Sequence, residues 1–135
     1  MAGETDLNRL LSSMSPSINN QAFVFTKIEK ADYPKLEKLQ PIGTFQEKEA
    51  LTVIVTKQAA EQFHLPYESV FKCITLSVHS SLEAVGLTAA VASKLAEYNI
   101  SANVVAAYYH DHIFVCETDA VQAMKALHEL SQQGI

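Results

Sequence analysis

Two histidines stand one residue apart in residues 108–115, YYHDHIFV, near the end of the chain. His110 and His112 have a spacing that two ligands of one metal ion can use. A catalytic zinc needs a third protein ligand and outer hydrogen bonds, and His79 is the only obvious further imidazole. No HExxH, CxxC or facial His/carboxylate set accompanies them. His110-Asp111 fits a two-residue turn between strands. We therefore expect turn and sheet-surface histidines, and neither a metal site nor a cofactor.

Other catalytic patterns are weaker still. Ser80 follows His79 directly and lies in no GxSxG turn, so a nucleophile with its base is not indicated. Glu47 and Glu49 stand at an expected hairpin tip, which favours a solvated charge cluster over an acid–base pair. Cys73 and Cys116 each lie in an apolar run, which favours reduced, buried thiols. A redox pair stays open if their strands prove to be neighbours. The sequence predicts a protein that is not an enzyme.

Composition excludes several classes of partner. The 135 residues are 48% hydrophobic, so one ordinary domain or two very small ones can form a packed core. A net charge of −5 without any basic run argues against nucleic acid and anionic membranes as partners. The N-terminus lacks the apolar segment of a secretory signal, and no 18-residue apolar stretch occurs. We expect a cytoplasmic protein.

The first half predicts a helix, a strand, a connection, a hairpin and a second helix. Leu7, Leu10, Leu11 and Met14 recur at helical spacing, with Thr5 or Asp6 as N-cap and Ser15-Pro16 as the stop. The remaining elements are expected as a strand at 22–28, an irregular connection at 29–41, strands near 42–47 and 50–56, and a short helix at 57–63.

The second half begins again with a strand at 71–79. A helix at 86–99 and a last helix at 118–133, capped by Thr118 or Asp119, follow the 3.6-residue period. Between them, strands at 103–109 and 113–117 are joined at His110-Asp111, so Tyr108 and Tyr109 should point to opposite faces of their strand. The apolar residues expected to face inward from the two helices are Leu87, Val91, Leu95, Tyr98, Val121, Met124, Leu127 and Leu130.

The two halves align as a repeat. Strand and helix starts separated by 62 positions are Ile42 and Val104, Ala50 and His112, and Thr56 and Thr118. The first strands, from Phe23 and Phe71, differ by only 48. The first unit therefore lacks about one helix. Strand–helix–strand–strand–helix is most of the split βαβ pattern, which predicts an α+β, ferredoxin-like sandwich in tandem duplication. Edge strands left without partners predict that the units, and then two chains, associate.

Residues 79–91, HSSLEAVGLTAAV, followed by residues 95–104, LAEYNISANV, resemble the ACT domain family. Members typically show a strand, a loop closing on Gly-Leu, a helix, a Gly/Asn-Ile turn and a further strand. The resemblance covers residues 71–131 directly and implies a βαββαβ, ACT-like fold. Two departures occur. Glu83-Ala84-Val85-Gly86 replaces Asp-x-Pro-Gly, and Asn99 replaces a Gly, although Asn tolerates the left-handed conformation.

The resemblance implies a site for an amino acid or similar metabolite, between the strand–helix loop of one unit and a strand of its neighbour. Helix-opening amides can receive a carboxylate, and Gly86 permits close backbone approach. Ser80 and Ser81 add hydroxyls, and Asn103 would hold an amino group. Equally, the serines can make turn hydrogen bonds and Gly86 can serve the turn alone. The expected ligand-binding residues are Ser80, Ser81, Glu83, Val85, Gly86, Leu87 and Asn103.

The expected organisation is an N-terminal helix and turn (1–20), a first, degenerate ACT-like unit (21–68) and a second unit (69–135). The leading hypothesis is a non-enzymatic, amino-acid-binding regulatory module that works as a homo-oligomer, with neither nucleic acid nor membrane as partner. The alternative is a structural protein–protein interaction module with a vestigial ligand site. An enzyme using His79, His110 and His112 with a metal is the third hypothesis.

Overall fold

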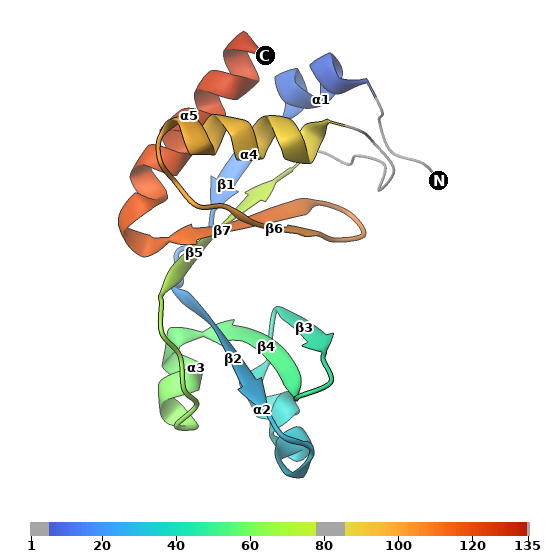
Figure 1. The fold of residues 1–135 in the computed structure, drawn as a ribbon, viewed down its shortest axis with the longest axis vertical. Helices are drawn as coiled ribbons and strands as arrows, with labels where there is room; N and C mark the ends of the chain where they lie inside the picture. The colour runs from blue at the N-terminus through green and yellow to red at the C-terminus, as the bar shows by residue number, and fades with distance from the viewer. Residues whose placement is uncertain (1–5, 78–85, 135) are drawn as a thin grey trace. The chain divides into compact units, whose positions relative to one another are not determined.

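The structure, a computed structural model, describes residues 6–77 and 86–134, and these form two compact units (Figure 1). The larger unit combines Met1–Asn19 with Lys72–Ile135, and the smaller unit is Asn20–Phe71. The N-terminal helix, expected as a separate segment, therefore belongs with the C-terminal half.

The larger unit is an antiparallel sheet with three helices on one face (Figure 1). Strand β5 lies between β1 and β7, and β6 pairs with β7. The strands are β1 (Pro16–Ile18), β5 (Phe71–Leu76), β6 (Asn103–Ala106) and β7 (Asp111–Cys116). The helices are α1 (Leu7–Ser13), α4 (Leu87–Glu97) and α5 (Ala120–Gln133), the last preceded by the 3-10 turn η2 (Glu117–Asp119).

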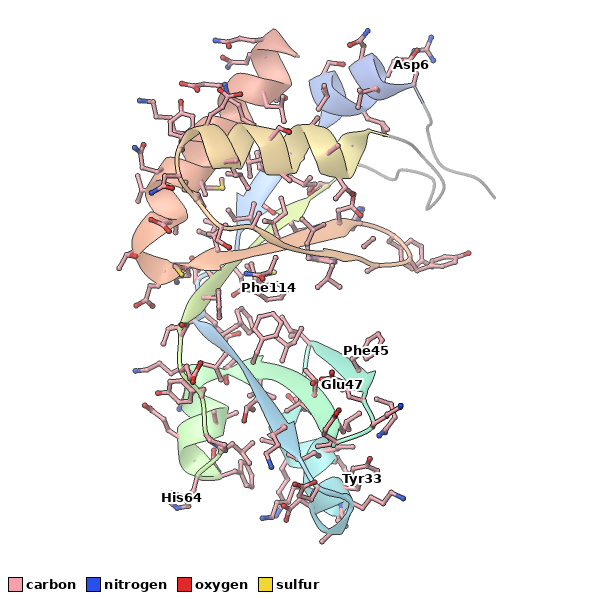
Figure 2. All side chains as sticks on the ribbon, viewed as in Figure 1. Asp6, Tyr33, Phe45, Glu47, His64 and Phe114 are labelled. Carbon is pink, nitrogen blue, oxygen red and sulfur yellow. The ribbon has the colours of Figure 1, made fainter. Side chains whose placement is uncertain are left out.

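Helix α1 is part of the core of the larger unit. Its N-cap is Asp6 (Figure 2), one of the two caps expected from the sequence, whose Oδ1 accepts a hydrogen bond from the amide of Arg9 at 3.0 Å. Leu10, Leu11 and Met14 are buried against α4, α5 and the strands. Burying three such side chains stabilises the unit by several kcal/mol, at about 1.5–3 kcal/mol each. The helical spacing of apolar residues in the sequence therefore correctly predicted a helix that packs against the core of the larger unit.

The smaller unit holds three antiparallel strands in the order β2-β4-β3 and short helical segments. The strands are β2 (Phe23–Ile28), β3 (Gly43–Gln46) and β4 (Leu51–Thr56), as expected. The helical segments are η1 (Lys30–Lys35), α2 (Leu36–Leu39) and α3 (Lys57–Gln62). Residues 30–39 are thus helical where an irregular connection was expected, and the part that contains Pro34 is a 3-10 helix rather than an α-helix. The α-helical part of this segment, α2, has four residues, whereas α4 has 11.

The repeat is real, but its offset is 60 in the hairpin rather than 62. β3 and β6 differ by 60 positions, and so do β4 and β7, while β2 and β5 differ by the expected 48. β4 and β7 also share the same pattern of buried and half-buried residues along their whole length. The corrected alignment pairs Leu51 with Asp111, and Thr26 with Ile74.

The hairpin turn of the larger unit was misplaced. Ala106 pairs with Asp111, and the amide of Ala107 donates to the carbonyl of His110 at 3.1 Å, so Tyr108-Tyr109 is the turn. Both tyrosines are exposed and their rings meet edge to face, with centroids 4.9 Å apart. The prediction of opposite strand faces was wrong, since neither tyrosine is in a strand.

The inner face of α5 also differs from the prediction. Val121 is 85% exposed, so its expected inward orientation was wrong. Leu127 and Leu130 are buried as predicted, Met124 is half-buried against the core, and the buried set is completed by Ala120, Ala123 and Ala126. Alanines allow the backbone of α5 to lie close to its neighbours. The inner face of α5 is therefore the one that carries the three alanines.

Candidate functional site

Gly86 is the N-cap of α4 and adopts φ +103°, a conformation that residues with a Cβ rarely reach. Ala90 donates its amide to the carbonyl of Gly86 at 2.8 Å, which marks the first bond of the helix. The amides of the first turn, beginning with Leu87, precede that bond and have no intrahelical acceptor. Gly86 has no side chain with which to cap them, whereas Asp6 and Thr56 cap α1 and α3. This helix end therefore presents donors suited to a carboxylate.

Leu7 of α1 forms an apolar wall beside this helix end. A Cβ built on Gly86 would lie 3.2 Å from Cδ2 of Leu7, with Cδ1 at 3.8 Å. Leu7 is half-buried and packs against the core of the larger unit. Its helical spacing in the sequence indicates a core residue and gives no sign of a place at the site. Only the fold brings α1 to the start of α4.

The other loop residues expected at the site lie outside the described residues. These are Ser80, Ser81, Glu83 and Val85, together with His79. Among the expected ligand-binding residues, the structure describes Gly86, Leu87 and Asn103, and Leu87 is buried in the core.

Asn103 lies on the opposite face of the sheet from Gly86. Its neighbour Val104 packs against the helix-covered core, and successive strand residues point to opposite faces. The Asn103 Nδ2 donates to the carbonyl of Phe114 at 3.2 Å across the β6–β7 hairpin. Within one larger unit, Asn103 and the start of α4 are therefore not brought together.

Asp111 is the first residue of β7 and is only 7% exposed. It alternates with Ile113 and Val115, so it shares their face of the sheet, the one that α4 and α5 cover. Burial raises the pKa of its carboxyl group, and the neighbouring His112 and His110 lower it by smaller amounts. No hydrogen bond to its carboxylate comes from the part of the chain that the structure describes. Sequence reasoning missed this residue by assigning it to a solvated turn, and the 60-residue offset would have revealed it.

His112 points to the other face of β7. Its Nδ1 lies 2.9 Å from Oγ1 of Thr75 on the neighbouring strand, a hydrogen bond that fixes the ring. Desolvation lowers the pKa of His112, repulsion by His110 lowers it further, and Asp111 partly opposes both. His112 is therefore neutral near pH 7, consistent with a sheet-surface role.

The described residues give little support to a metal site or a reactive thiol. Within residues 6–77 and 86–134, no three His, Cys, Asp or Glu side chains gather where they could hold a metal ion. Both Cys73 and Cys116 are free thiols, and burial raises the pKa of Cys73, with Thr75 opposing the shift through a hydrogen bond. A raised pKa leaves little thiolate for reaction. None of the helices in the described part is long and apolar enough to cross a membrane.

Known proteins resemble the chain along its whole length. The ACT domain family matches twice, over residues 2–72 and over residues 68–129. A crystal structure from Vibrio cholerae, of a protein of unknown function named a possible transport protein, is 50% identical. It has a TM-score of 0.84, with 93% of this chain and 96% of that chain covered. Among curated proteins, none matches.

More distant structures share the fold. A protein from Agobacterium tumefaciens has a TM-score of 0.70 at 16% identity, covering 87% of this chain and 89% of that one. The ligand-free regulatory subunit of aspartate kinase from Thermus thermophilus has a TM-score of 0.58 at 9% identity, covering 87% and 97%.

The chain belongs to the ACT domain family and carries two tandem ACT units. The α+β, ferredoxin-like fold expected from the sequence is confirmed. Family membership supports, in general terms, a regulatory role that involves binding a small molecule.

Proposed function

We propose that this chain is a non-enzymatic, cytoplasmic regulatory module that binds an amino acid at the start of α4. The observation that carries the proposal is the start of an 11-residue helix at Gly86, an N-cap residue at positive φ that has no side chain to cap the first-turn amides, which can therefore receive a carboxylate. Membership of a regulatory family adds to it. The ligand-binding residues proposed are Ser80, Ser81, Glu83, Val85, Gly86, Leu87 and Asn103.

Asn103 takes part in this proposal from a second copy of the chain. It lies on the sheet face opposite Gly86, so its own α4 is out of reach. Strand β6 pairs with β7 along one side, and Val105, Tyr108 and Tyr109 are exposed on and beside it. An edge strand carrying apolar side chains favours association with another sheet edge. The proposal therefore includes a homo-oligomer with ligands between copies.

Thermal unfolding with each of the twenty amino acids at millimolar concentration tests the proposal. A ligand present at about 100 times its Kd adds roughly 2.7 kcal/mol to the stability of the folded state. A rise in Tm with one or two amino acids, lost in Gly86→Val, supports binding at α4. Light scattering after size-exclusion chromatography reports the oligomer.

The alternative function, a structural interaction module with a vestigial site, predicts a different pair of results. The exposed Tyr108-Tyr109 turn beside the β6 edge is the observation that favours it. It predicts an oligomer that is unchanged by every amino acid in the panel and that dissociates when both tyrosines are replaced by serine.

A further inference from the structure

Asp111 is a carboxylate that the fold does not require. In the smaller unit the position equivalent to Asp111 is Leu51, the first residue of β4. Leu51 is also buried, and the two strands have the same pattern of buried residues. An apolar leucine is thus accommodated at this strand position in the other unit of the same chain. Burying a carboxylate instead costs free energy unless hydrogen bonds or an opposite charge compensate it. The described residues supply only the nearby His110 and His112, and burial still outweighs them in the pKa of Asp111.

The start of α4 and Asp111 lie at the same end and on the same face of the larger unit. The contact between Thr75 and His112 places the start of β7 beside the end of β5, the strand that leads to α4. At its other end α4 returns through Ile100 to Asn103, which pairs with Phe114 away from the hairpin turn. The helix therefore starts at the turn end of the hairpin, as Figure 1 shows. Asp111 shares the helix-covered face with Ile113 and Val115, so it lies on the face that α4 covers, at the end of the sheet where that helix starts.

We propose that Asp111 binds the ammonium group of the ligand while the first-turn amides of α4, beginning with Leu87, bind its carboxylate. This inference rests on the proposed function and restricts the ligand to a zwitterionic α-amino acid. Opposite charges on the two protein groups match the opposite charges of such a ligand. The small exposed fraction of Asp111 shields the ion pair from water, which strengthens it.

Leu7 adds selectivity for the remainder of the ligand. Its methyl groups lie within 4 Å of the Cβ position of Gly86, so the start of the helix has an apolar neighbour. A polar ligand side chain placed against them would lose hydrogen bonds to water. An apolar amino acid is therefore preferred over a charged one.

Calorimetric titration of the full chain tests the role of Asp111, with Asp111→Asn as the variant and Glu97→Gln as the matched control. Glu97 is on α4, but its side chain is 66% exposed. The ligands are the twenty amino acids and four acids that lack the α-amino group: propionate for alanine, 4-methylpentanoate for leucine, succinate for aspartate and 6-aminohexanoate for lysine. We expect Asp111→Asn to weaken amino-acid binding by roughly 30-fold or more. Glu97→Gln should leave binding unchanged, and the des-amino acids should bind wild type and Asp111→Asn equally.

The outcomes separate this inference from the proposed function. An amino acid that binds wild type and Asp111→Asn equally overturns the role of Asp111 and leaves the proposed function intact. If no amino acid binds wild type, both are overturned. Asp111→Leu guards against misfolding of the asparagine variant, since Leu51 shows that leucine suits this position; its folded state is checked by urea unfolding before titration.

Discussion

Replacing Asp111 by leucine should stabilise the protein, although the change removes a charged residue from a strand. Asp111 is a buried residue, and the described residues give its carboxylate no hydrogen bond. A leucine buried to the extent of Leu51 gains about 1.5–3 kcal/mol of transfer free energy. Leucine is larger than aspartate, and its imperfect fit at position 111 reduces this gain by up to about 1.5 kcal/mol. Relief of carboxylate desolvation adds about 1 kcal/mol or more, so we expect a net gain of about 2 kcal/mol.

The dependence of this gain on pH follows from the pKa of Asp111. Burial raises its folded-state pKa above the ordinary value of 3.8, so the folded protein favours the protonated form. Below pH 3.8 both folded and unfolded chains carry a protonated carboxyl group, and the electrostatic penalty is absent. As pH rises through the folded-state pKa, the penalty develops and the wild type loses stability relative to a variant without the charge. Asp111→Asn, which removes only the charge, should therefore be more stable than wild type at pH 7 and about equal at pH 3.

Urea unfolding at pH 7 and pH 3 measures both effects, followed by far-UV circular dichroism. For a chain of this size each kcal/mol moves Tm by about 3–5 °C, so thermal scans at pH 7 should show Asp111→Leu higher by roughly 6–10 °C. The control Glu97→Gln should remain within about 0.5 kcal/mol of wild type, as exposed substitutions do. A loss of stability in Asp111→Leu at pH 7 would refute the reasoning. So would a difference between wild type and Asp111→Asn that does not change with pH.

Four further substitutions test other parts of the structure by thermal and urea unfolding. Gly86→Ala should cost about 1–3 kcal/mol, because φ +103° strains any Cβ and Leu7 must shift; an unchanged Tm would contradict this backbone geometry. Thr26→Val should gain about 1 kcal/mol, since the Oγ1 of Thr26 is buried without a hydrogen-bond partner in the part of the chain described; a loss would show that the hydroxyl is satisfied. On α5, Leu127→Ala should cost about 2–5 kcal/mol and Val121→Ala less than about 0.5 kcal/mol, and the reverse order would restore the inner face expected from the sequence.

Local signals predicted most of the elements correctly. Helix α4 ends at Glu97, and Asn99, two positions later, adopts φ +59°, the left-handed conformation that Asn tolerates better than most residues. Asp6 and Thr56 cap their helices through their own side chains. Caps, periods and helix-ending residues depend on neighbours within four positions, so they can be read from sequence.

The misplaced hairpin turn shows where local signals are insufficient. Tyr108 and Tyr109 are typical strand residues, and His110-Asp111 offers the better turn composition. The observed register is consistent with burying Ile113 and Val115 on the helix-covered face, and a slip of one residue would reverse every side chain. The core thus sets the register, at the expense of exposing two aromatic rings.

The face of α5 was missed for a related reason. A hydrophobicity pattern ranks Val121 above Ala120 and Ala123 as a core residue, although the alanines are the ones buried. Close helix packing favours small residues at the contact, and this preference depends on the distance to α1 and α4 rather than on the sequence of α5 itself. Alanine periodicity is a weak signal until the neighbouring helices are known.

The two units provide an internal comparison that separates structural requirement from function. At two buried strand positions one unit is apolar and the other polar: Ile74 corresponds to Thr26, and Leu51 to Asp111. Thr26 belongs to the smaller unit, which has a 3-10 turn and a four-residue helix in place of α4, so no full-length helix start accompanies its hydroxyl. Asp111 belongs to the larger unit, where the complete helix is present on the same face. Under the proposal a carboxylate is useful there, because the first turn of the 11-residue α4 can bind the other end of a zwitterion. Under this proposal the degenerate unit has lost its binding chemistry together with its helix, and each chain binds one amino acid at α4.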